Sequence, residues 1–221
     1  MTHSARDDVN PGKSRIRVLI ADDHSIVAEG LRSLLATTYD VIGIVPDGRK
    51  LLEEAPKVKP EVIVLDISMP LLNGLDAAGR LRQLLPNTKL VFLTMSDDPN
   101  LAAAAMDLGP VGYVLKHDAS SELLKAVAEV LQGHSFISRR VRAENWAERE
   151  VRARRFAKEL TPRQREVLQL LAEGRSMKEI AAVLDVSEKT VEFHKYSIMQ
   201  TFNLKTNADV VRFALNRNLV P

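Results

Sequence analysis

The sequence contains no cysteine and no long hydrophobic run. The absence of cysteine excludes a disulfide framework and a thiolate metal site, and it fits a reducing compartment. No segment approaches the roughly 18 uninterrupted apolar residues that a membrane-spanning helix needs. Residues 1–14 are polar and lack the apolar region of a signal peptide. We therefore expect a soluble, cytoplasmic protein with no membrane partner, whose residues 1–14 form a disordered tail.

Net charge is small over the whole chain but unevenly distributed. The 221 residues carry a formal net charge of +2, and their number suits one large domain or two small ones. Residues 1–133 contain 14 Lys and Arg against 18 Asp and Glu (net −4), whereas residues 134–221 contain 17 against 11 (net +6). This contrast favours contact between the second part and a polyanion such as nucleic acid. The alternative is an accident of surface composition.

Residues 15–133 alternate between apolar runs and amphipathic stretches, which is typical of an α/β fold. The runs are almost continuously apolar, as expected for strands whose two faces are both covered by helices. We predict a doubly wound (βα)5 domain with a five-stranded parallel sheet. The expected strands lie near residues 16–21, 41–45, 61–66, 88–94 and 111–115, and the expected helices near 25–37, 48–55, 73–85, 97–108 and 120–132.

Residues 134–160 change character, because Arg, Lys and Glu there alternate with alanine. Glu148 and Arg152, and likewise Glu150 and Arg154, are four positions apart with the acid first, which supports a solvated helix. We therefore predict a helical linker over 134–160. A coiled coil is the less favoured alternative, because the apolar residues do not keep a heptad.

Residues 161–221 carry explicit signals for helix starts. Thr161 precedes a proline and, three positions on, a glutamine, which together predict an N-cap with a capping box. Ser176 begins a second such box, and Ser187 and Thr206 are expected N-caps of two further helices, over 187–202 and 207–217. Gly174 is expected to end the first helix. We predict an all-α domain of four short helices over 161–221.

Several chemically active residues follow the predicted strands directly. These are Asp22 and Asp23, Asp66, Thr94 and Lys116. The carboxyl ends of parallel strands meet at a crevice outside the sheet, so these side chains should share one pocket. Crowded carboxylates repel one another unless a cation is present, and their oxygens suit a hard ion such as Mg²⁺. An Asp-Asp pair alone is as often a helix N-cap, so the prediction depends on the order of all the residues.

Residues 15–133 closely resemble a receiver domain. The matching stretches are VLIADDH (18–24), VLDISMP (64–70), Asn73-Gly74, Leu93-Thr94 and the run from Gly109 to Lys116. The resemblance implies that Asp66 is the phosphoacceptor and that Asp22, Asp23 and Asp66 hold Mg²⁺. It also implies that the backbone carbonyl of Ser68 completes the metal site.

The same resemblance assigns roles to three residues around the phosphoacceptor. Lys116 is expected to pair with the incoming phosphoryl group, and Thr94 to hydrogen-bond it. Tyr113 is expected to be a switch residue coupled to Thr94, although an aromatic ring at the edge of the core is the alternative. Phosphoryl transfer is mostly positioning and charge neutralisation, which a divalent ion and one lysine supply.

Residues 177–196 fit a helix-turn-helix template. Ala181 stands where two helices cross, Asp185 occupies the turn and Val191 follows six positions later. Glycine is usual at the turn, but aspartate tolerates the left-handed conformation better than most residues. A helix-turn-helix can be purely structural, so this template alone leaves DNA binding open.

The run from Leu160 to Lys195 resembles the LuxR-type module, and the chain as a whole resembles NarL/FixJ-family response regulators. In this resemblance the helix 187–202 lies in the major groove with its N-terminal half facing the bases. Val191, Ile198 and Met199 should face the core. The residues expected to meet DNA are Ser187, Lys189, Thr190, Glu192, Phe193, Lys195 and Tyr196.

Individual side chains of this helix suggest different contacts. Lys189 and Lys195 suit phosphates. Glu192 could accept a hydrogen bond from a cytosine amino group, and Phe193 could contact a thymine methyl group. We interpret His194 as a packing residue, because no second His or Cys lies at metal-ligand spacing.

These inferences predict a two-component response regulator. Its expected partners are a sensor histidine kinase, promoter double-stranded DNA, a second copy of the chain after phosphorylation and, as a further candidate, RNA polymerase. We expect no enzyme activity beyond phosphoryl acceptance and self-dephosphorylation. Before phosphorylation, the receiver is expected to cover the recognition helix or the dimer surface. The alternatives are a phosphotransfer or phosphate-sink protein whose helices serve protein contacts, and a DNA binder that ignores phosphorylation.

Overall fold

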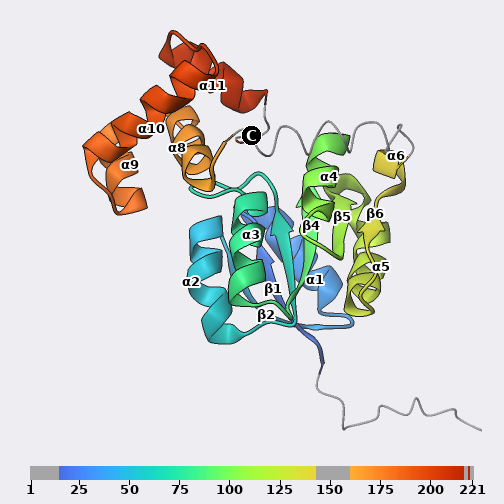
Figure 1. Ribbon diagram of the computed structural model, residues 1–221. Coiled ribbons are helices and arrows are strands. Elements are labelled where there is room, and N and C mark those ends of the chain that lie inside the picture. The colour runs from blue at the N-terminus through green and yellow to red at the C-terminus, as the bar shows by residue number, and fades with distance from the viewer. Residues whose placement is uncertain (1–14, 143–159, 217–218, 220–221) are drawn as a thin grey trace, which may run out of the picture.

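The computed structural model describes residues 15–142, 160–216 and 219. A parallel sheet flanked by helices forms the first part, and a group of helices forms the second (Figure 1). The predicted tail (1–14) and the linker pairs Glu148/Arg152 and Glu150/Arg154 lie outside the described residues. No described helix is long and apolar enough to cross a membrane.

The sheet has six parallel strands in the order β2-β1-β3-β4-β5-β6. Since β1 pairs with β2 on one side and β3 on the other, the strand order reverses there, which opens a crevice at the carboxyl ends of the strands. The strands are β1 (Arg17–Ala21), β2 (Asp40–Val45), β3 (Val62–Asp66), β4 (Lys89–Thr94), β5 (Val111–Leu115) and β6 (Phe136–Ile137).

Helices cover both faces of the sheet, which explains the continuously apolar strands. Successive strand residues alternate between two buried clusters: in β1, Leu19 belongs to one and Ile20 to the other. The first cluster lies under α2 (Gly48–Val58), α3 (Gly74–Leu84) and α4 (Pro99–Met106). The second lies under α1 (Ser25–Leu35) and α5 (Ala119–Leu131). The predicted α/β architecture is confirmed.

The five predicted strands are joined by a sixth short strand that the sequence analysis did not predict. Phe136 and Ile137 form β6, paired with Gly112 and Tyr113, inside the region expected to be helical. Short helix α6 (Arg139–Arg142) follows, and its Val141 is buried in the cluster under α4. These apolar side chains add to the receiver core, so burial overrides the helical propensity of the surrounding charged sequence.

The C-terminal helices are α8 (Pro162–Ala172), α9 (Met177–Leu184), α10 (Glu188–Thr201) and α11 (Asn207–Leu215). The capping boxes at Thr161 and Ser176 are present, and Ser187 and Thr206 cap the next two helices. Asp185 adopts the left-handed conformation between α9 and α10, with φ of 52°. The predicted helix-turn-helix geometry is therefore confirmed within the described residues.

Candidate functional site

Three of the predicted site residues lie together at the carboxyl edge of the sheet. Asp22 follows β1, Asp66 ends β3 and Lys116 follows β5. The Lys116 Nζ atom lies 2.8 Å from Asp22 Oδ2 and 2.8 Å from Asp66 Oδ2. Both carboxylates are almost completely buried. The ammonium group therefore partly neutralises two crowded negative charges.

Burial and pairing act against each other on these groups. Burial raises the pKa of Asp66, although its hydrogen bond with Lys116 opposes this shift. Burial also disfavours the charged form of Lys116, but its interactions with Asp22 and Asp66 outweigh that effect and raise the pKa of the ammonium group. Holding two buried negative charges in this site therefore costs free energy, and a further cation would reduce that cost.

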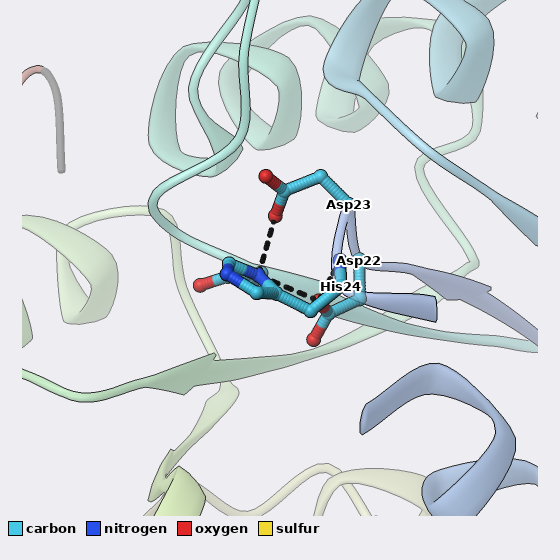
Figure 2. Close-up of side chains that lie close together, drawn as sticks. Asp22, Asp23 and His24 are labelled. Atoms are coloured by element: carbon cyan, nitrogen blue, oxygen red, sulfur yellow. Dashed lines mark hydrogen bonds and ion pairs between the residues drawn. The ribbon is translucent and has the colours of Figure 1, made fainter. Parts of the chain in front are cut away.

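Asp23 and His24 extend the cluster towards solvent (Figure 2). His24 Nδ1 lies 2.9 Å from Asp23 Oδ1 and 3.5 Å from Asp22 Oδ1. Asp22, Asp23, His24 and Asp66 can each offer one ligand atom, all within 4.8 Å of one another. The sequence analysis did not assign His24 to this cluster, and its place directly after Asp23 is the only signal that pointed there.

The residues at this edge fit a divalent cation. Asp22 Oδ2 is buried and, among the described residues, accepts no hydrogen bond of good geometry, although the Lys116 ammonium lies 2.8 Å away. The donors are mainly carboxylate oxygens, which suit a hard ion. Ser68, the remaining expected ligand, donates its N–H to Asp66 Oδ1 at 3.1 Å, which fixes the start of the loop after β3.

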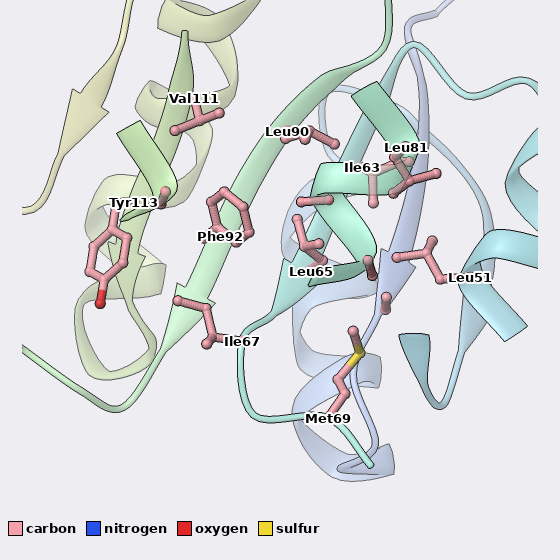
Figure 3. Close-up of a cluster of buried hydrophobic side chains, with 14 of the residues drawn as sticks. Leu51, Ile63, Leu65, Ile67, Met69, Leu81, Leu90, Phe92, Val111 and Tyr113 are labelled. Atoms are coloured by element: carbon pink, nitrogen blue, oxygen red, sulfur yellow. The ribbon is translucent and has the colours of Figure 1, made fainter. Parts of the chain in front are cut away.

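Thr94 and Tyr113 are joined through the backbone of Ser96. Thr94 Oγ1 accepts a hydrogen bond from the Ser96 N–H at 3.0 Å, and the Tyr113 hydroxyl donates to the Ser96 carbonyl at 3.1 Å. The Tyr113 ring is fully buried beside Phe92 (Figure 3), and this burial raises the pKa of its hydroxyl. Rotation of Thr94 towards Asp66 would therefore disturb the segment that Tyr113 also holds.

Helix α10 presents the side chains expected to meet DNA. Phe193 and Tyr196 are 68% and 63% exposed, whereas Val191 and Ile198 are buried, as predicted. Large exposed aromatic groups are uncommon without a partner. The predicted packing role of His194 agrees with its half-buried ring. Burial and, second, Arg163 lower the pKa of this histidine.

Among the seven residues predicted to contact DNA, two also have structural roles. Ser187 Oγ accepts the Thr190 N–H at 3.1 Å, and the two hydroxyl groups lie 2.8 Å apart. Lys189 and Glu192 are exposed, and Lys195 is half-buried. These side chains run from the N-cap to the middle of α10, and the N-terminal part of this helix is the part that enters the groove in helix-turn-helix proteins.

Of the two surfaces that the receiver was expected to cover, the recognition helix or the dimer surface, the recognition helix is exposed in this structure. Contacts between the two parts run through α8, which lies beside the loop between β3 and α3 (Figure 1). The exposure of Phe193 and Tyr196 agrees with this arrangement. The reason is that polar groups on α8 pair with the loop, and α10 packs on α8 and α9.

Comparison with known proteins identifies both parts. Residues 18–128 match the response regulator receiver domain, and residues 158–214 match the luxR family of bacterial regulatory proteins. The chain belongs to the response regulators that join these two domains. The predicted resemblance to this class is therefore confirmed.

Relatives of this response regulator match it over nearly its full length. It is 33% identical to the transcriptional regulatory protein MctR of Rhizobium johnstonii, over 94% of this chain and 97% of the relative. It is 34% identical to the uncharacterized transcriptional regulatory protein YxjL of Bacillus subtilis, over 94% of this chain and 99% of the relative. These names support transcriptional regulation as the function of the class.

Solved structures of RcsB are similar in fold. The Salmonella typhimurium RcsB response regulator gives a TM-score of 0.64 at 30% identity, covering 91% of this chain and 97% of that chain. An RcsB–DNA complex gives 0.55 at 31% identity, covering 90% and 98%. This response regulator therefore shares both its sequence class and its domain folds with a protein whose structure is known in complex with DNA.

Proposed function

We propose that this response regulator is phosphorylated on Asp66 by a sensor histidine kinase. The observation that carries the proposal is the placement of one ammonium group, Lys116, 2.8 Å from both Asp22 and Asp66 at the carboxyl edge of the sheet. An acceptor carboxylate, a second acid and a fixed cation are the groups that phosphoryl transfer requires. We propose Asp22, Asp23, Asp66 and the Ser68 carbonyl as the Mg²⁺ ligands.

The proposed step is an in-line displacement at phosphorus. A carboxylate oxygen of Asp66 forms a bond to phosphorus while the bond from phosphorus to the donor breaks, and the product is an acyl phosphate. A bound Mg²⁺ ion would neutralise charge on the transferring oxygens. Lys116 exchanges its contact with Asp66 for one with the phosphoryl group, and Thr94 donates its hydroxyl to the same group. We also assign self-dephosphorylation to this site.

The second part of the proposal is regulated binding to promoter DNA as a homodimer. Its support is the exposed N-terminal half of α10 and the luxR-family match over residues 158–214. Lys189 and Lys195 would contact phosphates, whereas Glu192 and Phe193 would face base edges, with Ser187, Thr190 and Tyr196 beside them. We place the protein in the cytoplasm, where DNA and RNA polymerase are available as partners.

We propose a receiver over 15–133, a linker over 134–160 and a DNA-binding domain over 161–221. The described part of the linker remains attached to the receiver, because the Ser138 hydroxyl accepts the Leu115 N–H at 3.1 Å. Ser138 therefore lies beside Leu115, the last residue of β5, which immediately precedes Lys116 in the sequence. Movement at Lys116 can reach the linker through this contact.

Labelling of the full chain tests the phosphoacceptor. Asp66→Ala should abolish acid-stable, base-labile incorporation of phosphate from acetyl phosphate and Mg²⁺, because the proposal makes Asp66 the attacking group and gives Asp22, the other described carboxylate that pairs with Lys116, the role of metal ligand only. Asp40→Ala, which removes an exposed carboxylate at the amino end of β2, is the matched control. Equal labelling of Asp66→Ala and the control would refute the assignment.

DNA binding by the full chain tests the output. Affinity should fall steeply with salt, since contacts to phosphates release counterions, and it should rise after phosphorylation. If no promoter DNA is bound in either state, the phosphate-sink alternative replaces the proposal. Equal affinity in both states would favour a DNA binder that ignores phosphorylation.

A further inference from the structure

Helix α8 of the DNA-binding domain contacts the loop that follows Asp66. This β3–α3 loop comprises residues 67–73. Gln169, whose side chain is buried, makes three hydrogen bonds with it. Its Nε2 atom donates to the Met69 carbonyl at 2.9 Å, and its Oε1 atom accepts from the Asn73 N–H at 2.9 Å and from Asn73 Nδ2 at 3.2 Å. One side chain thus joins the two ends of a five-residue stretch.

Leu71, in the middle of that stretch, has an unfavourable backbone conformation. Its φ is +65°, a left-handed value that favours glycine and is uncommon for a residue with a bulky side chain. Two contacts with the DNA-binding domain hold it there. The Leu71 N–H donates to Glu173 Oε1 at 3.0 Å, and the side chain packs against the core of the C-terminal helices. Residues of α8 and its C-cap therefore select this loop conformation.

Charged pairs flank the same contact. Glu166 is buried on α8 and pairs with Arg49 and Arg80 of the receiver, its Oε2 atom lying 3.1 Å from Arg49 Nη2. Arg165 Nε lies 2.7 Å from Asp76 Oδ1 on α3. Polar partners on both sides of the loop make this a specific interface, since each buried charge has a fixed counterpart.

We propose that α8 acts as a latch on the β3–α3 loop and slows phosphorylation of Asp66. The inference rests on the proposed function, because it assumes Asp66 as acceptor and the Ser68 carbonyl as a metal ligand. Ser68 lies one residue before Met69, the first loop residue that Gln169 holds. Phosphoryl transfer requires Asp66 and Ser68 to adjust around one ion. A loop fixed at Met69, Leu71 and Asn73 adjusts less, so the docked form reaches the transition state at a higher free energy.

Linkage gives the proposal a second consequence. Where docking also disfavours the phosphorylated state at equilibrium, phosphorylation must weaken docking by the same factor. The recognition helix is exposed in the docked form, with Phe193 68% exposed. The latch therefore controls the freedom of the DNA-binding domain and the reactivity of Asp66. It does not control access to the DNA-contacting surface.

The test compares full chains of the wild type, Gln169→Ala, Glu173→Ala, which removes the acceptor of the Leu71 N–H, and a matched control. Gln83→Ala serves as the control, because Gln83 is exposed on α3. Acetyl phosphate with Mg²⁺ is the donor: an Asp66 oxygen bonds to phosphorus, the bond between phosphorus and the acetyl oxygen breaks, and acetate leaves with the electron pair. We expect initial rates at least threefold above wild type for both variants and a wild-type rate for the control.

Hydrogen exchange of the peptide 68–76 reports the latch itself. Both variants should exchange faster there than the wild type, and phosphorylated wild type should show the same change. Faster exchange without faster phosphorylation would overturn the proposal, and so would unchanged exchange in both variants. Asp66→Ala separates the two proposals: if it is labelled as strongly as the wild type, the assignment of Asp66 fails, whereas normal labelling of Asp66 at equal rates in all variants refutes only the latch.

Discussion

Gly74→Ala should distort the phosphoacceptor site through the backbone of Asp66. Gly74 is buried at the start of α3, and a Cβ atom added there would lie 2.1 Å from the backbone carbonyl oxygen of Asp66. Separations under 3.0 Å are essentially never seen for real Cβ atoms. One of the two backbones must therefore move by about 1 Å. Because the Gly74 N–H also donates to the Ile67 carbonyl at 2.9 Å, the loop would move with the helix.

The size of the effect follows from two opposing contributions. Overpacking costs about 1–3 kcal/mol, and a clash with backbone belongs at the upper end. Alanine recovers roughly 0.5–1 kcal/mol of helix propensity over glycine. We expect the free energy of unfolding, measured in urea, to fall by about 2 kcal/mol. A displacement of about 1 Å at a reacting group lowers rates by roughly 100-fold, which we expect for labelling from acetyl phosphate.

Gly79→Ala is the matched control for this prediction. It lies in the same helix α3, and an added Cβ atom has nothing within 4 Å. This variant should be more stable by roughly 0.5–1 kcal/mol and should be labelled at the wild-type rate. If Gly74→Ala behaves like Gly79→Ala in both assays, the close approach of α3 to Asp66 has no functional consequence and the reasoning is refuted.

Three further predictions concern the switch, the acceptor and the recognition helix. Thr94→Ala and Tyr113→Phe should each lower the free energy of unfolding by about 0.5–1.5 kcal/mol. In a double-mutant cycle measured by urea unfolding, the double variant should depart from additivity, whereas strict additivity would show that the two residues act separately. Because burial raises the pKa of Asp66 and only the ionised form attacks phosphorus, labelling should decline with falling pH at a higher pH than for an ordinary carboxyl. The contribution of Asp66 to the free energy of unfolding is lost as pH rises through its native pKa. Mg²⁺ should therefore raise the Tm more at neutral than at acid pH. An equal Tm shift at the two pH values would contradict this prediction. Glu192→Ala should relax preference at one base pair by about 1–3 kcal/mol, whereas Lys195→Ala should weaken all sequences alike; an unchanged selected motif with unchanged affinity would remove α10 from the groove.

Most strands and helices could be predicted because burial leaves a clear record in the sequence. The runs that became β1, β3 and β5 are mainly apolar and end at, or directly before, a charged residue, so both their existence and their ends were visible. Strand β6 has only two residues and lies beside a charged segment. A strand of that length shows no periodicity, and its pairing with β5 depends on the tertiary structure.

Proximity within the acidic site could be predicted, but the partners of each group could not. Asp22, Asp66 and Lys116 follow parallel strands, and parallel strands end at one edge, so their meeting follows from topology. The hydrogen bonds of Gln169 to Met69 and Asn73 join positions about a hundred residues apart. No local pattern encodes such a contact, because it depends on how two separately folded domains meet.

Two physical connections lead from the acidic site towards the output domain, and they differ in what they can transmit. Ser138 connects the end of β5 to the linker, with Val141 buried nearby, so this route can respond to Lys116. The other route runs from the β3–α3 loop to Gln169 and on through α8, where Gln164 Nε2 lies 3.1 Å from Ser197 Oγ on α10. Contiguity alone does not establish coupling. Gln169→Ala weakens only the second connection, because the contacts of Glu166 and Glu173 with the receiver remain. A smaller dependence of DNA affinity on phosphorylation in this variant would therefore assign part of the coupling to α8, whereas an unchanged dependence would favour the linker or dimer formation.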